Sequence, residues 1–372
     1  MNDSDASPHQ ENFARKRDVM EPPTSIHHSD SENRGSAPFF SIGITTYNRP
    51  DLLKQTLDSI SAQTFADFEA IVGNDYAEEP LSAELLGITD PRIRFENYPE
   101  NLGEAENMNA LLARSRGRYF TWQNDDDLYA PTFLEDVHAT LVKFDAPTCV
   151  FTSYELFEGA GCPEPTDVVA GTGTVFSGRE FLRRYFSGAL SAIGCAGVYS
   201  REYLHLVGGI KVLGDSHRPL YTEYLYLIRA GLEARVVHID QPLIRYRTHE
   251  GSWGGTTADL PLYSQVGGNL LNQSIDILKM PELRADFREN ISALLNFLVS
   301  DFFLKCRMDC RPLCRLRALP YFFFLKSKLN SLKGSTLYWQ ALMGWARAGM
   351  TLAWCMATQF SLKSLLRSRC VG

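Results

Sequence analysis

Three consecutive carboxylates are the residues best suited to chemistry in this sequence. Asp125, Asp126 and Asp127 follow Asn124 directly after a buried-strand pattern, and a helix pattern begins at Pro131. Adjacent carboxylates repel one another, so they are tolerated where water or a cation neutralises them. Oxygen ligands of this kind suit a hard divalent cation such as Mg²⁺ or Mn²⁺. The alternative is a solvated acidic turn that caps the next helix.

Two further polar groups follow strand patterns. The stretch from Thr45 to Pro50 (TTYNRP) ends one such pattern, and Asn74 and Asp75 end another. Ligands of parallel sheets bind beyond the carboxyl ends of the strands, so we expect these groups and the acidic cluster to converge at one edge. Hydroxyls and a carboxylate there could hydrogen-bond a base and a ribose, and a metal could hold a diphosphate. The absence of GxGxxG and GxxxxGK[ST] motifs disfavours a Rossmann dinucleotide site and a P-loop.

The elements that must position these residues alternate between strands and helices. Strands are predicted at 39–46, 68–74, 92–97, 117–123 and 149–155, and helices from Pro50, over 104–114 and from Pro131 to about Phe144. This alternation predicts an α/β fold with a mainly parallel sheet and helices on both faces. After Thr172 we predict helices at 178–187 and 220–230, strands at 195–200 and 234–238, and an all-helical extension beyond about residue 260.

The ordered motifs of the chain resemble those of glycosyltransferase family 2, the inverting group with a GT-A fold. The motifs are TTYNRP, NDYAEE, ENLGEAENMNA, NDDDLYAP and YRTH, and they fall within about residues 38–255. The resemblance implies a nucleotide-diphospho-sugar transferase domain at 38–258, between an N-terminal tail (1–37) and the helical extension (259–372). It also implies a nucleotide-sugar donor, a UDP-sugar first, and Mn²⁺ or Mg²⁺ as the cofactor. The implied acceptor is a glycan or a lipid-linked glycan of surface polysaccharide synthesis.

The same resemblance assigns roles to individual residues. Residues that would contact the nucleotide are Thr45, Tyr47, Asn48, Asp75 and Asp125. Those that would hold the metal are Asp126, Asp127 and His249, and those that would touch phosphate or acceptor are Arg247, Asn109 and Asp215. Two positions differ from the family pattern, since Asn124 stands in place of an outer Asp and Met108 in place of a basic residue.

An inverting transfer also needs a carboxylate that accepts the proton of the acceptor hydroxyl. The segment 222–231 resembles the family's acid-containing helix, in which the base precedes an Arg by six positions. Counting back from Arg229 gives Glu223, an isolated acid in an apolar helix. Asp215 is the second candidate, and a buried Glu223 that merely pairs with an Arg is the structural alternative.

The charge of the chain divides into two parts. Its 372 residues carry a formal net charge of −7, which argues against a general nucleic-acid binder. Residues 303–372 nevertheless contain twelve Lys or Arg and a single acid, so this segment carries +11. It is rich in Trp, Tyr and Phe, and its uncharged runs are shorter than the roughly 18–20 residues of a spanning helix. We therefore expect it to contact an anionic membrane surface, with a packing or dimer surface and a true span as alternatives.

Further expectations concern the N-terminus and the cysteines. Residues 1–37 are polar and poor in apolar side chains, which predicts disorder, and the first ten lack the apolar core of a secretory signal. We therefore expect a cytoplasmic protein, peripheral on the inner membrane face. The eight cysteines include no CxxC pair, and Cys306, Cys310 and Cys314 are spaced as one helical stripe, which favours packing over a metal or acylation site.

Two other functions compete with glycosyl transfer. A nucleotidyltransferase that makes the activated sugar would share the fold class, but it usually needs a Gly-rich basic loop after the first strand, where this chain has only Arg49. A catalytically inactive nucleotide-sugar-binding scaffold would be consistent with Asn124 and Met108. The intact acids Asp75, Asp126 and Glu223 argue against it.

Overall fold

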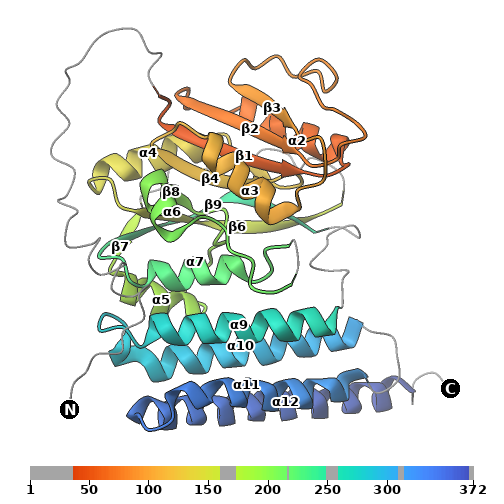
Figure 1. The fold of residues 1–372 in the computed structure, drawn as a ribbon, viewed down its shortest axis with the longest axis vertical. Coiled ribbons are helices and arrows are strands. Elements are labelled where there is room, and N and C mark those ends of the chain that lie inside the picture. Colours follow the sequence, from red (N-terminus) through yellow and green to blue (C-terminus); the bar gives the residue numbers. More distant parts are fainter. Residues whose placement is uncertain (1–36, 160–172, 216–217, 249–258, 309–313, 368–372) are drawn as a thin grey trace. The chain divides into compact units, whose positions relative to one another are not determined.

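A computed structural model of the protein describes residues 37–159, 173–215, 218–248, 259–308 and 314–367 (Figure 1). The strands in these ranges are β1 (Phe40–Thr46), β2 (Phe68–Asn74), β3 (Ile93–Asn97), β4 (Tyr119–Asn124), β5 (Leu128–Tyr129), β6 (Cys149–Glu158), β7 (Thr174–Phe176), β8 (Val198–Ser200) and β9 (Val236–Thr248). The α-helices are α2 (Pro50–Ser61), α3 (Glu104–Arg114), α4 (Phe133–Lys143), α5 (Gly178–Phe186), α6 (Arg201–Val207), α7 (Thr222–Ala230), α9 (Leu260–Leu278), α10 (Phe287–Met308), α11 (Ala318–Lys328) and α12 (Thr336–Arg367).

The described strands form one mixed sheet in the order β3-β2-β1-β4-β8-β6-β9-β5, with β7 also paired to β9. Strands β3, β2, β1 and β4 are parallel neighbours, and β6 is parallel to β9, while β5, β7 and β8 pair antiparallel. Thr46 is in register with Asn74 and Thr45 with Asn124, so the carboxyl ends of β1, β2 and β4 lie side by side. The predicted α/β fold with a mainly parallel sheet is confirmed.

Helices cover both faces of the parallel part of the sheet, as predicted. Ile42 and Ile44 of β1 belong to a buried cluster with the apolar faces of α2 and α4. Side chains alternate across a strand, so Gly43 points to the opposite face. There a Cβ atom would lie 2.7 Å from Phe120 and 3.2 Å from Leu111 of α3. A glycine in β1 thus allows α3 to pack closely against the sheet, directly beside the strand ends.

The predicted elements are present with two differences near the strand ends, and the sequence pattern does not predict β7 or α6. The strand predicted at 234–238 continues as β9 to Thr248, which carries Arg247 to the acidic loop. Leu128–Tyr129 forms β5, which pairs antiparallel with β9. A two-residue strand has no periodicity of its own, so the sequence pattern does not predict it.

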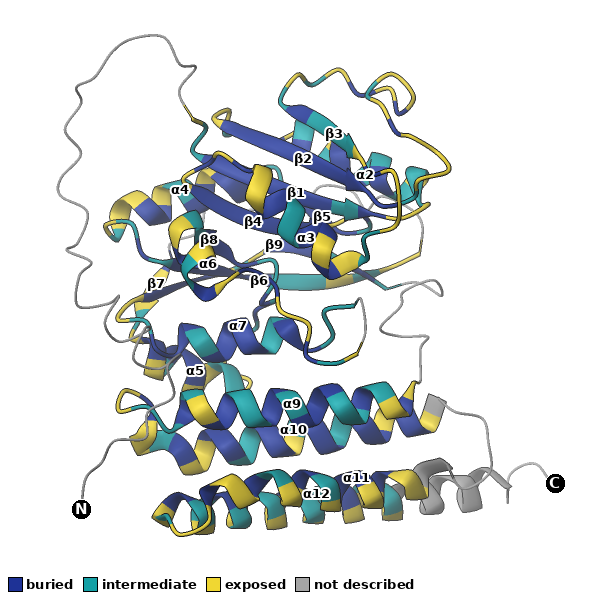
Figure 2. Cartoon of the chain, in the orientation of Figure 1, coloured by how far each residue is buried: buried dark blue, intermediate teal, exposed yellow. Residues whose placement is uncertain are grey.

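The predicted helical region begins at Leu260 and packs on α5 and α7. Arg179 of α5 forms an ion pair with Asp286, which precedes α10, and the ring of Tyr221 beside α7 lies 5.8 Å from that of Tyr263 in α9. Helix α12 lies along α10. Figure 2 shows that α9 and α10 contain many buried residues, and that exposed residues occur along α11 and α12.

The described helices include none that is both long and apolar enough to cross a bilayer. The tail for which disorder is predicted lies outside the described residues, except for residue 37. Of the predicted cysteine stripe, Cys306 is buried in α10. Cys310 and the side chain of Cys314 lie outside the described part of the chain.

Candidate active site

The acidic loop after β4 is held by Arg49, which lies in the loop between β1 and α2. Arg49 Nε donates to Asp125 Oδ2 at 3.2 Å, Nη2 donates to Asp125 Oδ1, and Nη1 donates to Asp126 Oδ2 at 3.0 Å. Thr46 Oγ1 also donates to Asp125 Oδ2, at 2.6 Å. Asp125 is fully buried, and a buried carboxylate is costly unless it is paired and hydrogen-bonded. A guanidinium therefore lies beside the carboxylates where the sequence predicts a cation.

Asp127 is bound from the opposite side by β9. The backbone amide of Arg247 donates to Asp127 Oδ1 at 2.8 Å, and Asn124 Nδ2 donates to Oδ2 at 2.8 Å. The Arg247 side chain is only 1% exposed, and it donates to the Asp126 carbonyl at 2.7 Å and to Gln55 Oε1 at 2.9 Å. These contacts favour a structural role for Arg247. They lend no support to its predicted contact with phosphate, or to Asp127 as a metal ligand.

Burial sets the electrostatics of the acidic loop. It raises the pKa of Asp125 to about 6, with Arg49 and Thr46 acting in the opposite direction. Burial, followed by the charge of Asp126, also raises the pKa of Asp127 above its usual range. Both carboxyls thus bind protons more tightly than exposed ones do. Additional positive charge at the loop would favour their ionised forms.

Two of the predicted nucleotide-binding residues beside β1, Tyr47 and Asn48, are open to solvent. Tyr47 is 50% exposed, and its ring centroid lies 5.3 Å from that of Tyr76 in an edge contact. Asn48 is exposed with φ +52°, a left-handed conformation that asparagine tolerates better than most residues. Thr45 is partly buried at the end of β1. An aromatic pair beside these polar groups suits the stacking of a nucleotide base.

Asp75, in contrast, is buried and organises a loop. Its two carboxylate oxygens accept hydrogen bonds from the backbone amides of Leu102 at 2.6 Å and Gly103 at 2.9 Å. These amides precede the first turn of α3, so Asp75 joins the end of β2 to the start of that helix. The contact of Asp75 with a base stays a prediction, and its observed bonds show a positioning role.

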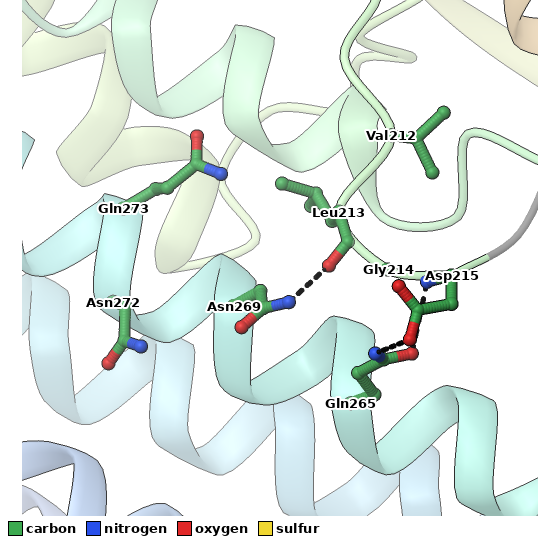
Figure 3. A pocket seen from close by; sticks show the side chains of 8 residues that line it. All are labelled: Val212, Leu213, Gly214, Asp215, Gln265, Asn269, Asn272 and Gln273. Carbon is green, nitrogen blue, oxygen red and sulfur yellow. Dashed lines mark hydrogen bonds between the residues drawn. The ribbon is translucent and has the colours of Figure 1, made fainter.

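Two predicted acceptor residues bind the segment between α6 and α7. Asn109 Oδ1 accepts from the Ile210 amide at 2.8 Å, and its Nδ2 donates to the Ile210 carbonyl at 3.0 Å. Asp215 Oδ2 accepts from Gln265 Nε2 at 2.7 Å (Figure 3). Figure 3 shows this pair at one end of a pocket of about 320 Å³, with Asn269 from the same helix beside it. Both residues thus anchor this segment to neighbouring helices.

Glu223, the candidate base, lies in the first turn of α7. Burial, followed by the charge of Asp301, raises its pKa to about 7. Burial, followed by the charges of Asp127 and Glu223, raises the pKa of Tyr246 in β9. Tyr246 precedes Arg247, whose backbone amide binds Asp127, so the acidic loop lies beside this part of β9. Among the described residues, Asp301, and no Arg, is the charged group that shifts the pKa of Glu223, which lends no support to the structural alternative.

The acidic loop offers one carboxylate that suits a metal ion. Within the described ranges, no group of three or more His, Cys, Asp or Glu side chains is arranged to hold one. Both oxygens of Asp125 and of Asp127 accept hydrogen bonds inside the protein. Asp126 has a side chain that is 13% exposed and contacts Arg49. It fits as a ligand if a diphosphate and water supply further oxygens. His249 lies outside the described residues.

Four residues of the site have no individual role in the sequence prediction, namely Thr46 and Arg49 of TTYNRP, Tyr76 of NDYAEE, and Gln55. Arg49 had a signal in the sequence, because it is the one cation between the first strand and the first helix and three acids follow the neighbouring strand. The particular contacts of Gln55 and Tyr76 have no signal in the sequence, since they depend on which loops become neighbours in the fold.

Comparisons with known proteins identify related sequences. Residues 41–207 match the model of the family described as "Glycosyl transferase family 2". An uncharacterised glycosyltransferase of Rickettsia felis is 25% identical over 224 residues, which is 58% of this chain and 35% of the relative. The putative colanic acid biosynthesis glycosyl transferase WcaA of Escherichia coli is 24% identical over 153 residues, 41% of this chain and 55% of the relative.

The chain therefore spans about a third to about half of the length of these curated relatives. Among solved structures, S. aureus TarS 1–349 in complex with UDP-GlcNAc superposes with a TM-score of 0.48 and 13% identity. That match covers 80% of this chain and 92% of TarS 1–349.

Proposed function

Because residues 41–207 belong to glycosyltransferase family 2, we propose that the protein is a metal-dependent inverting glycosyltransferase. The proposed donor is a nucleotide-diphospho-sugar, a UDP-sugar first, and the proposed acceptor is a hydroxyl of a glycan or lipid-linked glycan. The acidic loop at the adjoining carboxyl ends of β1 and β4 supports this proposal most directly, because it offers Asp126 beside the polar β1 loop for a metal and the leaving group. The name of the E. coli relative supports a role in surface polysaccharide synthesis.

In the proposed reaction the acceptor oxygen attacks the anomeric carbon from the face opposite the nucleotide. The new carbon–oxygen bond forms as the bond to the diphosphate breaks, and the Glu223 carboxylate takes the hydroxyl proton. A pKa of about 7 suits this task, because a base is most effective when its pKa lies near the working pH. When bound, a divalent cation supplies positive charge that stabilises the departing diphosphate. Asp126 would hold it.

The two competing functions make different predictions about the site. A nucleotidyltransferase needs a loop that cradles a triphosphate, but α2 begins at Pro50 directly after Arg49, and no glycine lies between β1 and α2. An inactive scaffold would be favoured if the ion pair between Arg49 and Asp126 persisted with a donor bound.

The proposal is tested by a thermal-shift screen of UDP-, GDP- and dTDP-sugars with and without Mn²⁺, followed by measurement of nucleotide diphosphate release with mixed glycan acceptors. We expect one class of nucleotide sugar to raise the melting temperature only with Mn²⁺, and to release its diphosphate when an acceptor is added. Stabilisation without release under any acceptor would favour the scaffold. Pyrophosphate release from UTP and a sugar phosphate would favour the nucleotidyltransferase.

We further propose that the outer surface of α11 and α12 contacts an anionic membrane. One stripe of α12 is exposed although it is apolar: Trp339, Met350 and Trp354 are 69%, 67% and 66% exposed. The opposite stripe is also apolar but buried against the neighbouring helices, through Leu337, Ala341, Ala348 and Leu352. Helix α12 therefore buries one apolar side and presents another to its surroundings (Figure 2).

The positive charge of this surface supports an anionic membrane as the proposed partner. Residues 318–367 contain no Asp or Glu, and Lys326 and Arg347 are exposed among the aromatic side chains. Trp side chains favour the boundary between headgroups and acyl chains, and each Lys or Arg near an anionic surface adds roughly 1 kcal/mol of attraction. A lipid-linked acceptor would lie on the same surface.

A further inference from the structure

Helix α7, which carries Glu223, begins at a residue with unusual backbone geometry. Tyr221 is the N-cap of α7, with φ +60° and ψ 3°, in the left-handed region. An L-residue with a large side chain is disfavoured there by roughly 1 kcal/mol or more, so neighbouring contacts have to hold it in place. Glu223 follows two residues later, and any change at Tyr221 is transmitted to the first turn of the helix.

The contact that holds Tyr221 comes from the helical region. Tyr221 Oη donates a hydrogen bond to Asp301 Oδ2 in α10, eighty residues further along the chain. The Tyr221 ring is buried, with its centroid 5.7 Å from that of Phe297 and 5.8 Å from that of Tyr263. One polar and two aromatic contacts from α9 and α10 thus fix the start of α7.

Two further contacts hold the first turn of α7. Thr222 Oγ1 donates to the Lys211 carbonyl at 2.6 Å. A Cβ atom on Gly194 would lie 2.0 Å from the Glu223 carbonyl oxygen, so only glycine allows this approach. Of the groups that hold the turn, Asp301 is the one that is both acidic and supplied by the helical region.

We propose that Asp301 is a positioning residue for Glu223: it holds Tyr221 at the start of α7 and adds a negative charge to the surroundings of the base. The proposal rests on the proposed function, because it takes Glu223 as the base. It assigns a catalytic contribution to a helix that lies beyond the residues matched by the family model, 41–207.

The titratable groups around Glu223 agree with this assignment. Those whose pKa is influenced by Glu223 are Tyr154 of β6, Tyr185 of α5, Cys195 before β8, Tyr224 of α7 and Tyr246 of β9. Burial raises the pKa of each of them, so all stay neutral at neutral pH. Asp301 is the described acid whose charge raises the pKa of Glu223, after the effect of burial.

The proposal is tested with Asp301→Asn, which removes the charge but keeps an oxygen that can accept from Tyr221. Full-length protein labelled with [13C]glutamate is titrated by NMR, and the Glu223 carboxyl signal is assigned by its loss in Glu223→Gln. We expect the Glu223 titration midpoint in Asp301→Asn to fall by roughly half a pH unit or more. Tyr263→Phe, which removes a hydroxyl from the same aromatic cluster, is the matched control and should titrate as wild type.

A second variant tests the hydrogen bond itself. Tyr221→Phe keeps the ring but removes the donor, and we expect kcat to fall about tenfold or more with the donor KM unchanged, because the base is displaced. An unchanged Glu223 midpoint in Asp301→Asn, or wild-type kcat in Tyr221→Phe, would overturn the proposal. A shifted midpoint together with full activity of Glu223→Gln would instead reject Glu223 as the base, and with it that part of the proposed function.

Discussion

Arg49 Nη1 lies 3.0 Å from Asp126 Oδ2, so a protein cation contacts the carboxylate proposed as the metal ligand. A divalent ion at Asp126 would have to compete with this guanidinium. A donor diphosphate gives Arg49 another anionic partner, and it gives the ion further oxygen ligands. Metal and donor should therefore bind cooperatively, and each should raise the affinity of the other by the same factor.

Replacing Asp126 with Asn tests the metal ligand. We expect the variant to lose Mn²⁺-dependent binding of the nucleotide sugar, because a neutral amide is a much poorer ligand for a hard cation. Isothermal titration of the donor with and without Mn²⁺ measures the effect. Asp58→Asn is the control, since Asp58 is an exposed acid that forms an ion pair with Lys54 of the same helix. Unchanged affinity in Asp126→Asn would remove Asp126 from the metal site.

Replacing Arg49 with Met should destabilise the protein, because it leaves the buried carboxylate of Asp125 without its cation. We expect a loss of about 2–3 kcal/mol in the free energy of unfolding, measured by urea denaturation. The double variant Arg49→Met/Asp125→Asn should recover part of that loss. Arg183→Met removes an exposed Arg of α5 and should cost little. Equal losses of unfolding free energy in Arg49→Met and Arg183→Met would contradict the proposed importance of the ion pair between Arg49 and Asp125.

Glu223→Gln should retain donor binding and lose transfer. The amide cannot accept the acceptor proton, so we expect kcat to fall by about 10² to 10⁴ while the donor dissociation constant stays the same. Diphosphate release under saturating acceptor measures the first quantity, and donor titration the second. Glu202→Gln changes an exposed acid of α6 and serves as the control. A Glu223→Gln variant with wild-type turnover would move the base to another residue.

The pH dependence of stability gives a separate measure of Glu223. Its pKa is about 7 in the folded protein and about 4.3 in an unfolded chain, so the folded state binds the proton more tightly. The stability that this group contributes is present below about pH 4 and is lost as the pH rises through 7. Relative to wild type, Glu223→Gln should therefore gain on the order of 3 kcal/mol between pH 4.5 and pH 8. A pH-independent difference in urea unfolding would contradict the raised pKa.

Replacing Trp339 and Trp354 together with Ala should weaken binding to vesicles of phosphatidylglycerol and phosphatidylcholine, measured by sedimentation. We expect wild type to bind these vesicles, to bind pure phosphatidylcholine poorly and to dissociate at 0.5 M NaCl, because the attraction is partly electrostatic. Leu85→Ala/Val142→Ala is the matched control, since these side chains are 66% and 67% exposed on the sheet-containing part. A changed oligomeric mass with unchanged vesicle binding would identify the stripe as a dimer surface instead.

The strands and helices were predictable where a local run of apolar residues marks them. β1, β2 and β4 are continuous apolar runs, and their parallel arrangement is enough to predict that the groups after them converge. The contacts made there were not predictable. The bond from Arg49 to Asp125 joins residues 76 positions apart, and it depends on β4 lying next to β1.

Burial also decided roles that residue types leave open. Arg247 has the side chain of a phosphate ligand, but β9 continues past the predicted end and buries it beneath the acidic loop. Asp301 is one acid in a long helix and has no motif around it. Its contact with Tyr221 follows only from the packing of α10 against the start of α7.

The Tyr221–Asp301 contact also limits how chains of this kind could recombine. A chimera that joined the α/β region of this protein to the helices of a relative would inherit Tyr221 from one parent and residue 301 from the other. If the parent that supplied the helices lacked an acid at the position of Asp301, the hybrid could fold and bind a donor but would hold Glu223 poorly. The α/β region and the helices after it are thus expected to be inherited together, as one unit of selection.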